Sequence, residues 1–404
     1  MSREYSSKRR WVACAILLGS MAACSGGSSK GPGERAPISL TAESGPPSLR
    51  TRVDRMVQPL VDQRRIIGAA IALVHDGEVE YMGYGQVAAD DPNRPAPDTF
   101  FEIGATGQVF TGLLLADFVA RDELAVDTPL QELLPGLRVP DGPGDPDGDA
   151  PDGDAPAQAI NLDHLITHTA GLPALSEIAP SPSGDPADLY GNFTEAALYR
   201  TLVATRLLSV PGETYHASDY GAAVLGSVLA RFAESTYEAL VIMRLLGPLN
   251  MSATVFELDP DQTGRLALGH DAEGALAPSW DYAVVMRGAG GWRSTTRDLA
   301  RLLKSHLERA PAELRAVYTL AEQVRYPGSE DGTSVGLGWH IDPRGVRWSS
   351  GQTGGYTSYI AYDRGNDSAV VLLCNTATPL AVQVGQALMR GLRGQWQPLD
   401  VPPE

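Results

Sequence analysis

The order of hydrophobic and polar positions predicts strands near the start of the chain. Two apolar runs at 68–74 and 78–85 flank an Asp-Gly pair at 76–77. This arrangement predicts a β-hairpin, because Asp-Gly supplies the backbone geometry of a tight turn. The apolar spacing over 49–66 predicts a helix before the hairpin, weakened by Pro59.

The middle of the chain has helical spacing, and its end returns to strands. Apolar residues from Val109 to Phe118 recur every three or four positions. Further predicted elements are helices at 194–208, 219–233, 235–246, 296–307 and 380–392, and strands at 336–341, 356–362 and 369–373. Strands near both ends with helices between them indicate an α+β sheet domain interrupted by a mainly helical insert. We place the sheet part at about 49–95 and 285–395, and the insert at about 96–284.

Composition narrows the class of protein. With 43% apolar and 20% charged residues in 404, the chain is typical of a globular protein large enough for a sizeable core. The net charge is −17, and no basic stripe follows residue 30, so we expect no nucleic-acid partner. No cofactor motif is present, and we expect none to be bound.

The first 24 residues predict export. A basic start precedes an apolar run at 11–19, which is typical of a signal peptide and too short for a permanent span. Met-Ala-Ala before Cys24 resembles a bacterial lipobox, so we expect Cys24 to carry lipid. Residues 25–48 are rich in Gly, Ser and Pro and predict a flexible tether. The expected location is the periplasm or cell surface, anchored to a membrane; the alternative is secretion after cleavage near Ala23.

An acidic segment at 141–156 is the one candidate metal site. Asp145, Asp147 and Asp149 offer the oxygen ligands that Ca²⁺ prefers. The EF-hand pattern requires a glycine where Ala150 stands, and a distal glutamate. We therefore favour a solvated acidic loop over a calcium site, and expect no metal.

Seven segments together resemble one enzyme family. They are F-E-I-G at 101–104, H-L-I-T-H-T-A-G-L-P at 164–173, P-G-E-T-Y at 211–215, G-P-L-N-M-S-A-T at 247–254, A-G-G-W-R-S-T-T-R-D-L-A-R at 289–301, G-L-G-W at 336–339 and G-Q-T-G-G at 351–355. In this order they resemble motifs of the serine β-lactamase and penicillin-binding-protein family, in the class C-like branch that includes D-amino-acid peptidases and esterases. The resemblance spans about 49–392 and implies an antiparallel sheet flanked by terminal helices, with a helical insert.

The first motif of the resemblance lacks its nucleophile and its base. The family pattern is Ser-x-x-Lys at a helix start, where one turn brings the amine beside the hydroxyl. Ala105 and Gln108 occupy these positions. A methyl group cannot attack a carbonyl, and an amide accepts no proton near neutral pH. None of the three lysines of the chain has a serine three positions before it.

The other two motifs are also substituted. Where the family has Tyr-x-Asn, this chain has Ala217, Ser218 and Asp219; where it has Lys- or His-Thr-Gly, this chain has Gln352, Thr353 and Gly354. Tyr215 and Tyr220 lie near the missing phenol in sequence but out of register. The resemblance also implies an oxyanion hole from the backbone amides of Ala105 and Gly355, which need no side chain. The candidate ligand cleft is therefore expected at Ala105, Gly355, Thr353 and Asp219.

Other chemical motifs have plainer interpretations. Thr106 would point about 100° away from the lost serine, so we interpret it as a helix-start residue. The G-x-S-x-G match at 332–336 is followed by strand rather than helix. His164 and His168 lie four apart, but Leu165 replaces the glutamate of a zinc protease motif, so both are interpreted as structural.

We therefore expect a catalytically inactive envelope protein that binds or scaffolds. Loss of a serine nucleophile alone costs on the order of 10⁶ in turnover. The ligand implied by the resemblance is a peptidoglycan-derived peptide or a small acyl group. One alternative is an active hydrolase in which Asp219 activates water; another is a structural role in an envelope complex.

Overall fold

The computed structural model describes residues 47–142, 159–178, 189–308, 310–328 and 332–399, which belong to one compact unit. The expected lipidation site Cys24 and the candidate calcium ligands Asp145, Asp147 and Asp149 lie outside the described residues. Among the helices that are described, none has both the length and the apolar character needed to cross a membrane.

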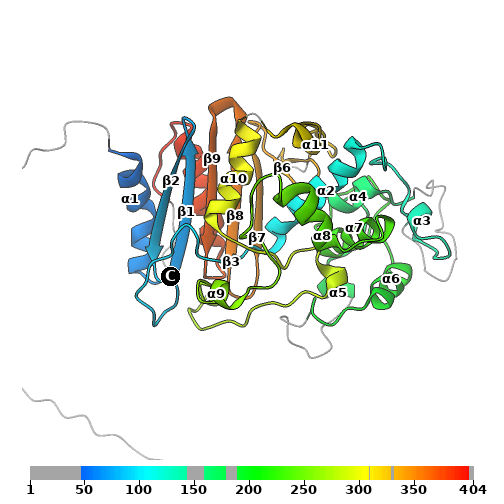
Figure 1. Cartoon of the computed structure of the whole chain (residues 1–404), viewed down its shortest axis with the longest axis horizontal. Helices are drawn as coiled ribbons and strands as arrows, with labels where there is room; N and C mark the ends of the chain where they lie inside the picture. Colours follow the sequence, from blue (N-terminus) through cyan, green and yellow to red (C-terminus); the bar gives the residue numbers. More distant parts are fainter. Residues whose placement is uncertain (1–46, 143–158, 179–188, 309, 329–331, 400–404) are drawn as a thin grey trace, which may run out of the picture. The chain divides into compact units, whose positions relative to one another are not determined.

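Seven antiparallel strands form the main sheet (Figure 1). The hairpin of β1 (Gly68–His75) and β2 (Glu78–Gly85) pairs through β1 with β9, the last strand in the chain. The sheet thus joins the two ends of the domain. Its order is β2-β1-β9-β8-β7-β6-β5, with β5 at Ser334–Val335, β6 at His340–Ile341, β7 at Arg347–Gln352, β8 at Thr357–Asp363 and β9 at Ser368–Cys374. A second sheet pairs β3 (Phe101–Glu102) with β4 (Arg293–Ser294).

Each face of the main sheet is covered by helices. Alternate side chains of β1, β8 and β9 point to opposite faces, which separates two apolar cores. The terminal helices α1 (Leu49–Asp62) and α12 (Pro379–Leu392) pack on one face. Helix α10 (Thr296–Leu307) packs on the other (Figure 1). The sheet is therefore the middle layer of a helix-sheet-helix arrangement.

The helical region is centred on α2 (Gln108–Ala120), and Figure 1 shows it beside the sheet. Every residue of α2 from Gln108 to Phe118 is buried. A helix that is apolar on all sides belongs in a core, so α2 is enclosed by its neighbours rather than lying on the surface. The helices that contact α2 are η1 (Gly104–Gly107), α4 (Leu162–Ile166), α7 (Asp219–Phe232), α8 (Tyr237–Val241), η3 (Ile242–Leu246) and α11 (Arg315–Ala321). The remaining short helices are α3 (Leu130–Leu133), α5 (Leu175–Ile178), α6 (Glu195–Ala204), α9 (Pro260–Thr263), η4 (Val284–Met286), η5 (Ala312–Leu314) and η6 (Arg364–Asn366), of which η6 connects β8 to β9.

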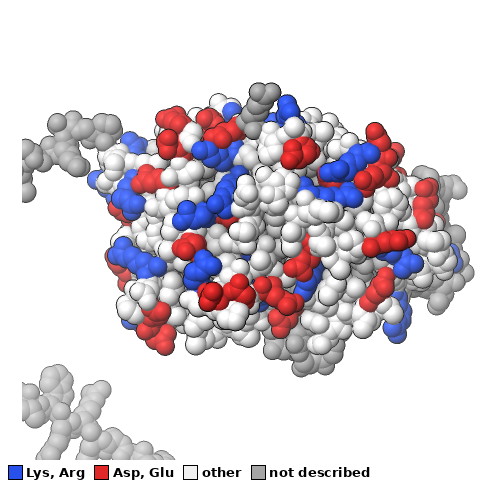
Figure 2. All heavy atoms as spheres, viewed as in Figure 1, with Lys and Arg blue, Asp and Glu red and all other residues white. Residues whose placement is uncertain are grey.

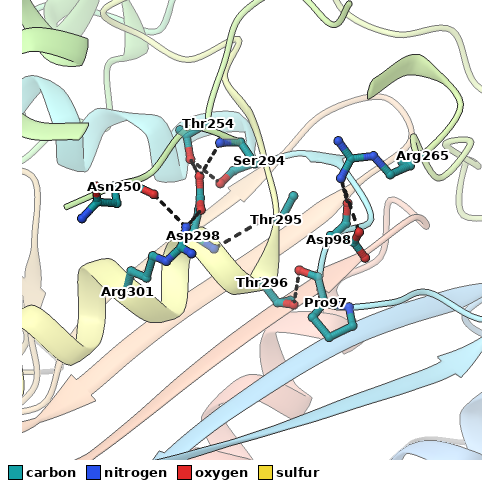
Figure 3. A network of polar contacts seen from close by, with 11 residues as sticks. Pro97, Asp98, Asn250, Thr254, Arg265, Ser294, Thr295, Thr296, Asp298 and Arg301 are labelled. Carbon is teal, nitrogen blue, oxygen red and sulfur yellow. Dashed lines mark hydrogen bonds and ion pairs between the residues drawn. The ribbon is translucent and has the colours of Figure 1, made fainter. Parts of the chain in front are cut away.

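A buried polar network holds the start of α10 (Figure 3). Asp298 Oδ2 accepts hydrogen bonds from the Ala253 amide (2.7 Å) and the Thr254 hydroxyl (3.2 Å), and Oδ1 pairs with Arg301 at 2.7 Å. The Thr295 hydroxyl caps the helix by accepting from the Asp298 amide. The network thereby joins two of the family-like segments, at 247–254 and 289–301.

The surface of the unit carries mixed charge. On the face that Figure 2 shows, Lys and Arg alternate with Asp and Glu, and no continuous basic area is visible. Exposed ion pairs on the described surface include Arg231 with Glu195 and Arg265 with Asp98. Pairs of this kind contribute little stability, typically under about 1 kcal/mol each.

Candidate functional site

Ala105 lies in η1, directly before α2, and close backbone packing holds it there. Gly104 has φ +50°, a conformation that favours glycine. A Cβ on Gly351 would lie 2.1 Å from the Ile103 carbonyl oxygen and 2.6 Å from the Ala105 nitrogen. Glycine at 351 therefore lets β7 run directly against η1, which fixes the position of Ala105 relative to the sheet.

A cavity of about 360 Å³ opens beside Ala105. It brings together four of the substituted family positions, which lie up to 114 positions apart in the chain: Ala105, Gln108, Ala217 and Asp219. The remaining lining residues come from α4 and the segment after it, from the loop before α7, and from the segments around β5, β6 and β7. They are Ile166, His168, Ala174, Tyr215, Ser218, Val335, Gly338, Trp339, His340, Ser349 and Ser350.

Gln108 borders this cavity from the first position of α2. Its side chain is 7% exposed, and its Nε2 donates a hydrogen bond to the Ala289 carbonyl at 3.2 Å. The amide of Gln108 therefore anchors the start of α2 to the segment before β4. It supplies no proton acceptor comparable to an amine.

Asp219 is held at the start of α7 by three donors. Its Oδ1 accepts from the backbone amides of Leu175 (3.2 Å) and Tyr220 (3.0 Å). Its Oδ2 accepts from the Tyr190 hydroxyl. Burial and the adjacent Asp219 charge raise the pKa of Tyr190, so the phenol keeps its proton and donates it. A carboxylate in the first turn also interacts favourably with the helix dipole.

Aromatic rings support Asp219 through Tyr190. Tyr190 stacks on Tyr282 with ring centroids 4.5 Å apart, and it lies 5.7 Å from Trp280. A Cβ on Gly354 would be 2.7 Å from the Trp280 indole nitrogen, so the third family-like motif packs against the same cluster. The carboxylate position is therefore set by a rigid aromatic support.

Two histidines and a tyrosine also line the cavity. The Tyr215 hydroxyl lies 3.3 Å from His340 Nε2, and the Tyr215 ring makes an edge contact with His168. His340 stacks on Trp348 with centroids 4.4 Å apart. Burial lowers the pKa of His168, so this imidazole is neutral near pH 7, and its Nδ1 lies 3.1 Å from both the amide nitrogen and the carbonyl oxygen of Ser218.

The third family-like motif lies next to the cavity but does not line it. Gln352 is exposed at the end of β7, with its backbone nitrogen 2.8 Å from the position of a Cβ on Gly104. Thr353 is 3% exposed, and Gly355 packs its backbone against that of Gly269. Within the described residues, neither the Ala105 amide nor the Gly355 amide donates a hydrogen bond to another protein group. Ala105 lines the cavity, whereas Gly355 is buried and does not line it.

The remaining motif candidates have structural roles. The Thr106 hydroxyl is buried and bonded to Ser358 at 2.8 Å, and Ser334 belongs to strand β5. His164 forms a capping box with Asn161 at the start of α4. Among the described residues, no group of three or more His, Cys, Asp or Glu side chains is arranged to hold a metal ion.

Sequence reasoning did not single out His340, Ser349 or Ser350, and it set Tyr215 aside as out of register. Tyr215 does reach the cavity, whereas Tyr220 is fully buried and donates to the Leu198 carbonyl. The only sequence signal for His340 is its position directly after the family-like segment 336–339. Its approach to Tyr215 joins positions 125 apart, which no local pattern encodes.

Comparison with known proteins places this arrangement in a family. The profile named Beta-lactamase matches residues 53–391. A curated "Beta-lactamase" of Pseudomonas fluorescens is 25% identical over 376 residues, covering 84% of this chain and 97% of the relative.

Solved structures agree with the profile. A class C β-lactamase superposes with a TM-score of 0.72 at 20% identity, covering 85% of this chain and 96% of that one. A D-alanine carboxypeptidase from Burkholderia cenocepacia superposes with a TM-score of 0.70 at 22% identity, covering 85% and 99%. The chain has the class C β-lactamase fold and belongs to the beta-lactamase family.

Proposed function

We propose that this protein is a non-acylating member of the beta-lactamase family that binds a ligand in the cavity beside Ala105. The observation that carries the proposal is the cavity lining. The position of the family's nucleophile holds the methyl group of Ala105, and Gln108 supplies an amide bound to the Ala289 carbonyl. The lining therefore offers no group at this position that could attack a carbonyl carbon.

The hydroxyl groups near Ala105 do not replace the nucleophile. Ser218 Oγ donates to the Pro173 carbonyl and accepts from the Gly221 amide, so it is committed to capping α7. Ser349 and Ser350 line the cavity, but neither hydroxyl is hydrogen-bonded to a histidine, a carboxylate or a phenol among the described residues. A serine without a base within hydrogen-bond reach is a weak nucleophile.

The geometry of Asp219 weighs against the alternative of water activation. A carboxylate offers about four lone-pair directions, and three of those of Asp219 already accept hydrogen bonds from Leu175, Tyr220 and Tyr190. The carboxylate is thus engaged by these donors. A general base gains catalytic power by taking up a proton during the reaction, which would weaken these interactions.

We further propose an envelope location, from the sequence alone. The signal-peptide pattern and Cys24 support a lipid-anchored protein facing the periplasm or cell surface, with 25–48 as its tether. The ligand would then come from the envelope. Radiolabelled palmitate incorporation that disappears in Cys24→Ala tests the anchor, and unchanged incorporation contradicts it.

Covalent labelling tests the absence of acylation. The purified protein is incubated with a fluorescent penicillin, with a serine-reactive fluorophosphonate, and with p-nitrophenyl esters. We expect no label and no turnover above that of the Gln108→Ala/Asp219→Ala double variant. Labelling, or turnover that this double variant abolishes, would refute the proposal.

A further inference from the structure

The charge inside the cavity defines the class of ligand that fits it. Of the fifteen lining residues, Asp219 is the single carboxylate, and no lysine or arginine is among them. No ion pair joins Asp219 to a cation within the described residues. The cavity therefore presents a negative charge that the protein itself does not neutralise.

The bonding of Asp219 leaves room for a further donor. Its three donors are neutral groups: two backbone amides and the Tyr190 phenol. One lone-pair direction of the carboxylate remains. A charge-assisted hydrogen bond from a cation is roughly twice as strong as a neutral one, so a cationic donor is the preferred occupant.

The two imidazoles of the cavity are engaged by protein groups. His168 is neutral because burial lowers its pKa, and its Nδ1 is occupied by the Ser218 backbone. His340 directs its Nε2 at the Tyr215 hydroxyl. An anionic ligand would thus meet one fixed negative charge and no arginine or lysine, and would pay for desolvation without compensation.

The rest of the lining suits an uncharged body. Ile166, Ala174, Val335 and Trp339 are apolar, and the volume of about 360 Å³ accommodates a small molecule or one end of a peptide. We propose that the cavity binds a ligand that carries an ammonium or guanidinium group, with Asp219 as the residue that selects it. This inference rests on the proposed ligand-binding function and specifies the chemistry of the ligand.

A series of three probes of the same shape tests the selection. Binding of 3-phenylpropylammonium, 3-phenylpropanol and 3-phenylpropanoate to the purified protein is measured by calorimetry at about pH 8, where ordinary imidazoles are neutral. We expect the ammonium to bind about tenfold more tightly than the alcohol, and the carboxylate most weakly.

Three variants separate the charge from the fold. Asp219→Asn keeps the size and an acceptor oxygen, and should erase the preference for the ammonium. Asp219→Glu keeps the charge and should retain part of that preference. The matched control is Asp281→Asn, since Asp281 is exposed and does not line the cavity. It should bind all three probes as the wild type does.

The inference is overturned if the alcohol or the carboxylate binds as tightly as the ammonium, or if Asp219→Asn keeps the preference. It is also overturned if the ammonium does not bind below about 10 mM, the range of negligible affinity. Its failure is distinguishable from that of the proposed function. Covalent labelling refutes the non-acylating function whatever the order of the probes, and a wrong order refutes only the ligand class.

Discussion

The network around Asp298 and the cavity around Ala105 are both built from family-like segments, but they use polar groups differently. At Asp298, each oxygen of a carboxylate that is 1% exposed has a partner. In the cavity, Ala105 and Ala217 present methyl groups where the family motif has a hydroxyl and a phenol. A methyl leaves nothing unpaired, so the cavity tolerates the loss, whereas the network could not. The segments around Asp298 therefore hold the fold, while these two positions in the cavity lack the family's hydroxyl and phenol.

The largest effect is expected from restoring the missing groups in the cavity, since this would remove the difference between the two regions. The variant Ala105→Ser/Gln108→Lys/Ala217→Tyr/Gln352→His should be acylated by a fluorescent penicillin at least about 10³-fold faster than the parent, because nucleophile loss alone costs about 10⁶. Gel fluorescence measures the acylated fraction over time. The control restores positions 108, 217 and 352 but keeps Ala105, and should not label. Equal labelling of both variants would show that the four positions do not act together.

Removing the carboxylate at 298 tests the other region. Asp298→Ala leaves the Ala253 amide and Arg301 without their acceptor. We expect a loss of about 3–5 kcal/mol in the free energy of unfolding, since breaking a buried charged network costs this much. Urea titration followed by circular dichroism measures it. Asp261→Ala, at an exposed aspartate of α9, is the control and should change stability by under about 0.5 kcal/mol.

The buried histidine of the capping box predicts a pH dependence. Burial lowers the pKa of His164 from 6.5 to about 4. The unfolded chain therefore binds more protons below about pH 6.5, and stability falls as the pH falls towards 4. Between pH 8 and pH 5, this residue should lower the free energy of unfolding by about 2 kcal/mol. Urea titrations at both pH values should show a smaller loss in His164→Gln. The control His216→Gln should keep the wild-type difference, and an unchanged difference in His164→Gln would contradict the assignment.

The smallest expected effect concerns the cavity wall. Tyr215→Phe removes the hydroxyl that meets His340 at 3.3 Å. A single part-buried hydrogen bond contributes about 1 kcal/mol, so the free energy of unfolding should fall by this amount or less. Thermal melts compare it with Tyr326→Phe, whose hydroxyl makes a longer, exposed contact at 3.4 Å. If Tyr215→Phe lost more stability than Asp298→Ala, the distinction between the network around Asp298 and the cavity would be contradicted.

Several elements followed directly from the pattern of the sequence. The helix expected at 296–307 is α10 with the same bounds, and the hairpin expected at 68–74 and 78–85 is confirmed with β1 one residue longer. The strand expected at 369–373 is β9, at Ser368–Cys374. In each case the apolar residues recur with a regular spacing and lie on a buried face, so the sequence pattern and the packing agree.

Other elements depend on contacts that no local pattern records. Of the strand expected at 336–341, only His340–Ile341 forms a strand, β6; residues 336–339 turn between β5 and β6, and Gly338 in this turn has φ +76°. Strand β7, Arg347–Gln352, was not predicted as an element; its sequence R-W-S-S-G-Q has little apolar alternation, and pairing with β6 and β8 places it in the sheet. The helix expected at 235–246 changes to a π-helix at Ile242–Leu246.

The candidate site shows the same division. Ala105, Gln108, Ala217 and Asp219 were found from short motifs, and the cavity brings them together. The support of Asp219 by Tyr190, and the meeting of Tyr215 with His340, arise between segments far apart in the chain. Family motifs identify positions, whereas the contacts between positions require the fold.

The enclosure of α2 has a consequence for how such a protein evolves. Gln108 starts a helix that is buried on every side, and a lysine there would bring an ammonium group into a site that is 7% exposed. Burying an unpaired charge is costly, so an enzyme with this architecture has lower thermal stability because of the group that makes it reactive. A member of the family that does not carry out the reaction does not need this buried charge. It can therefore stay folded over a wider temperature range without any change to the sheet.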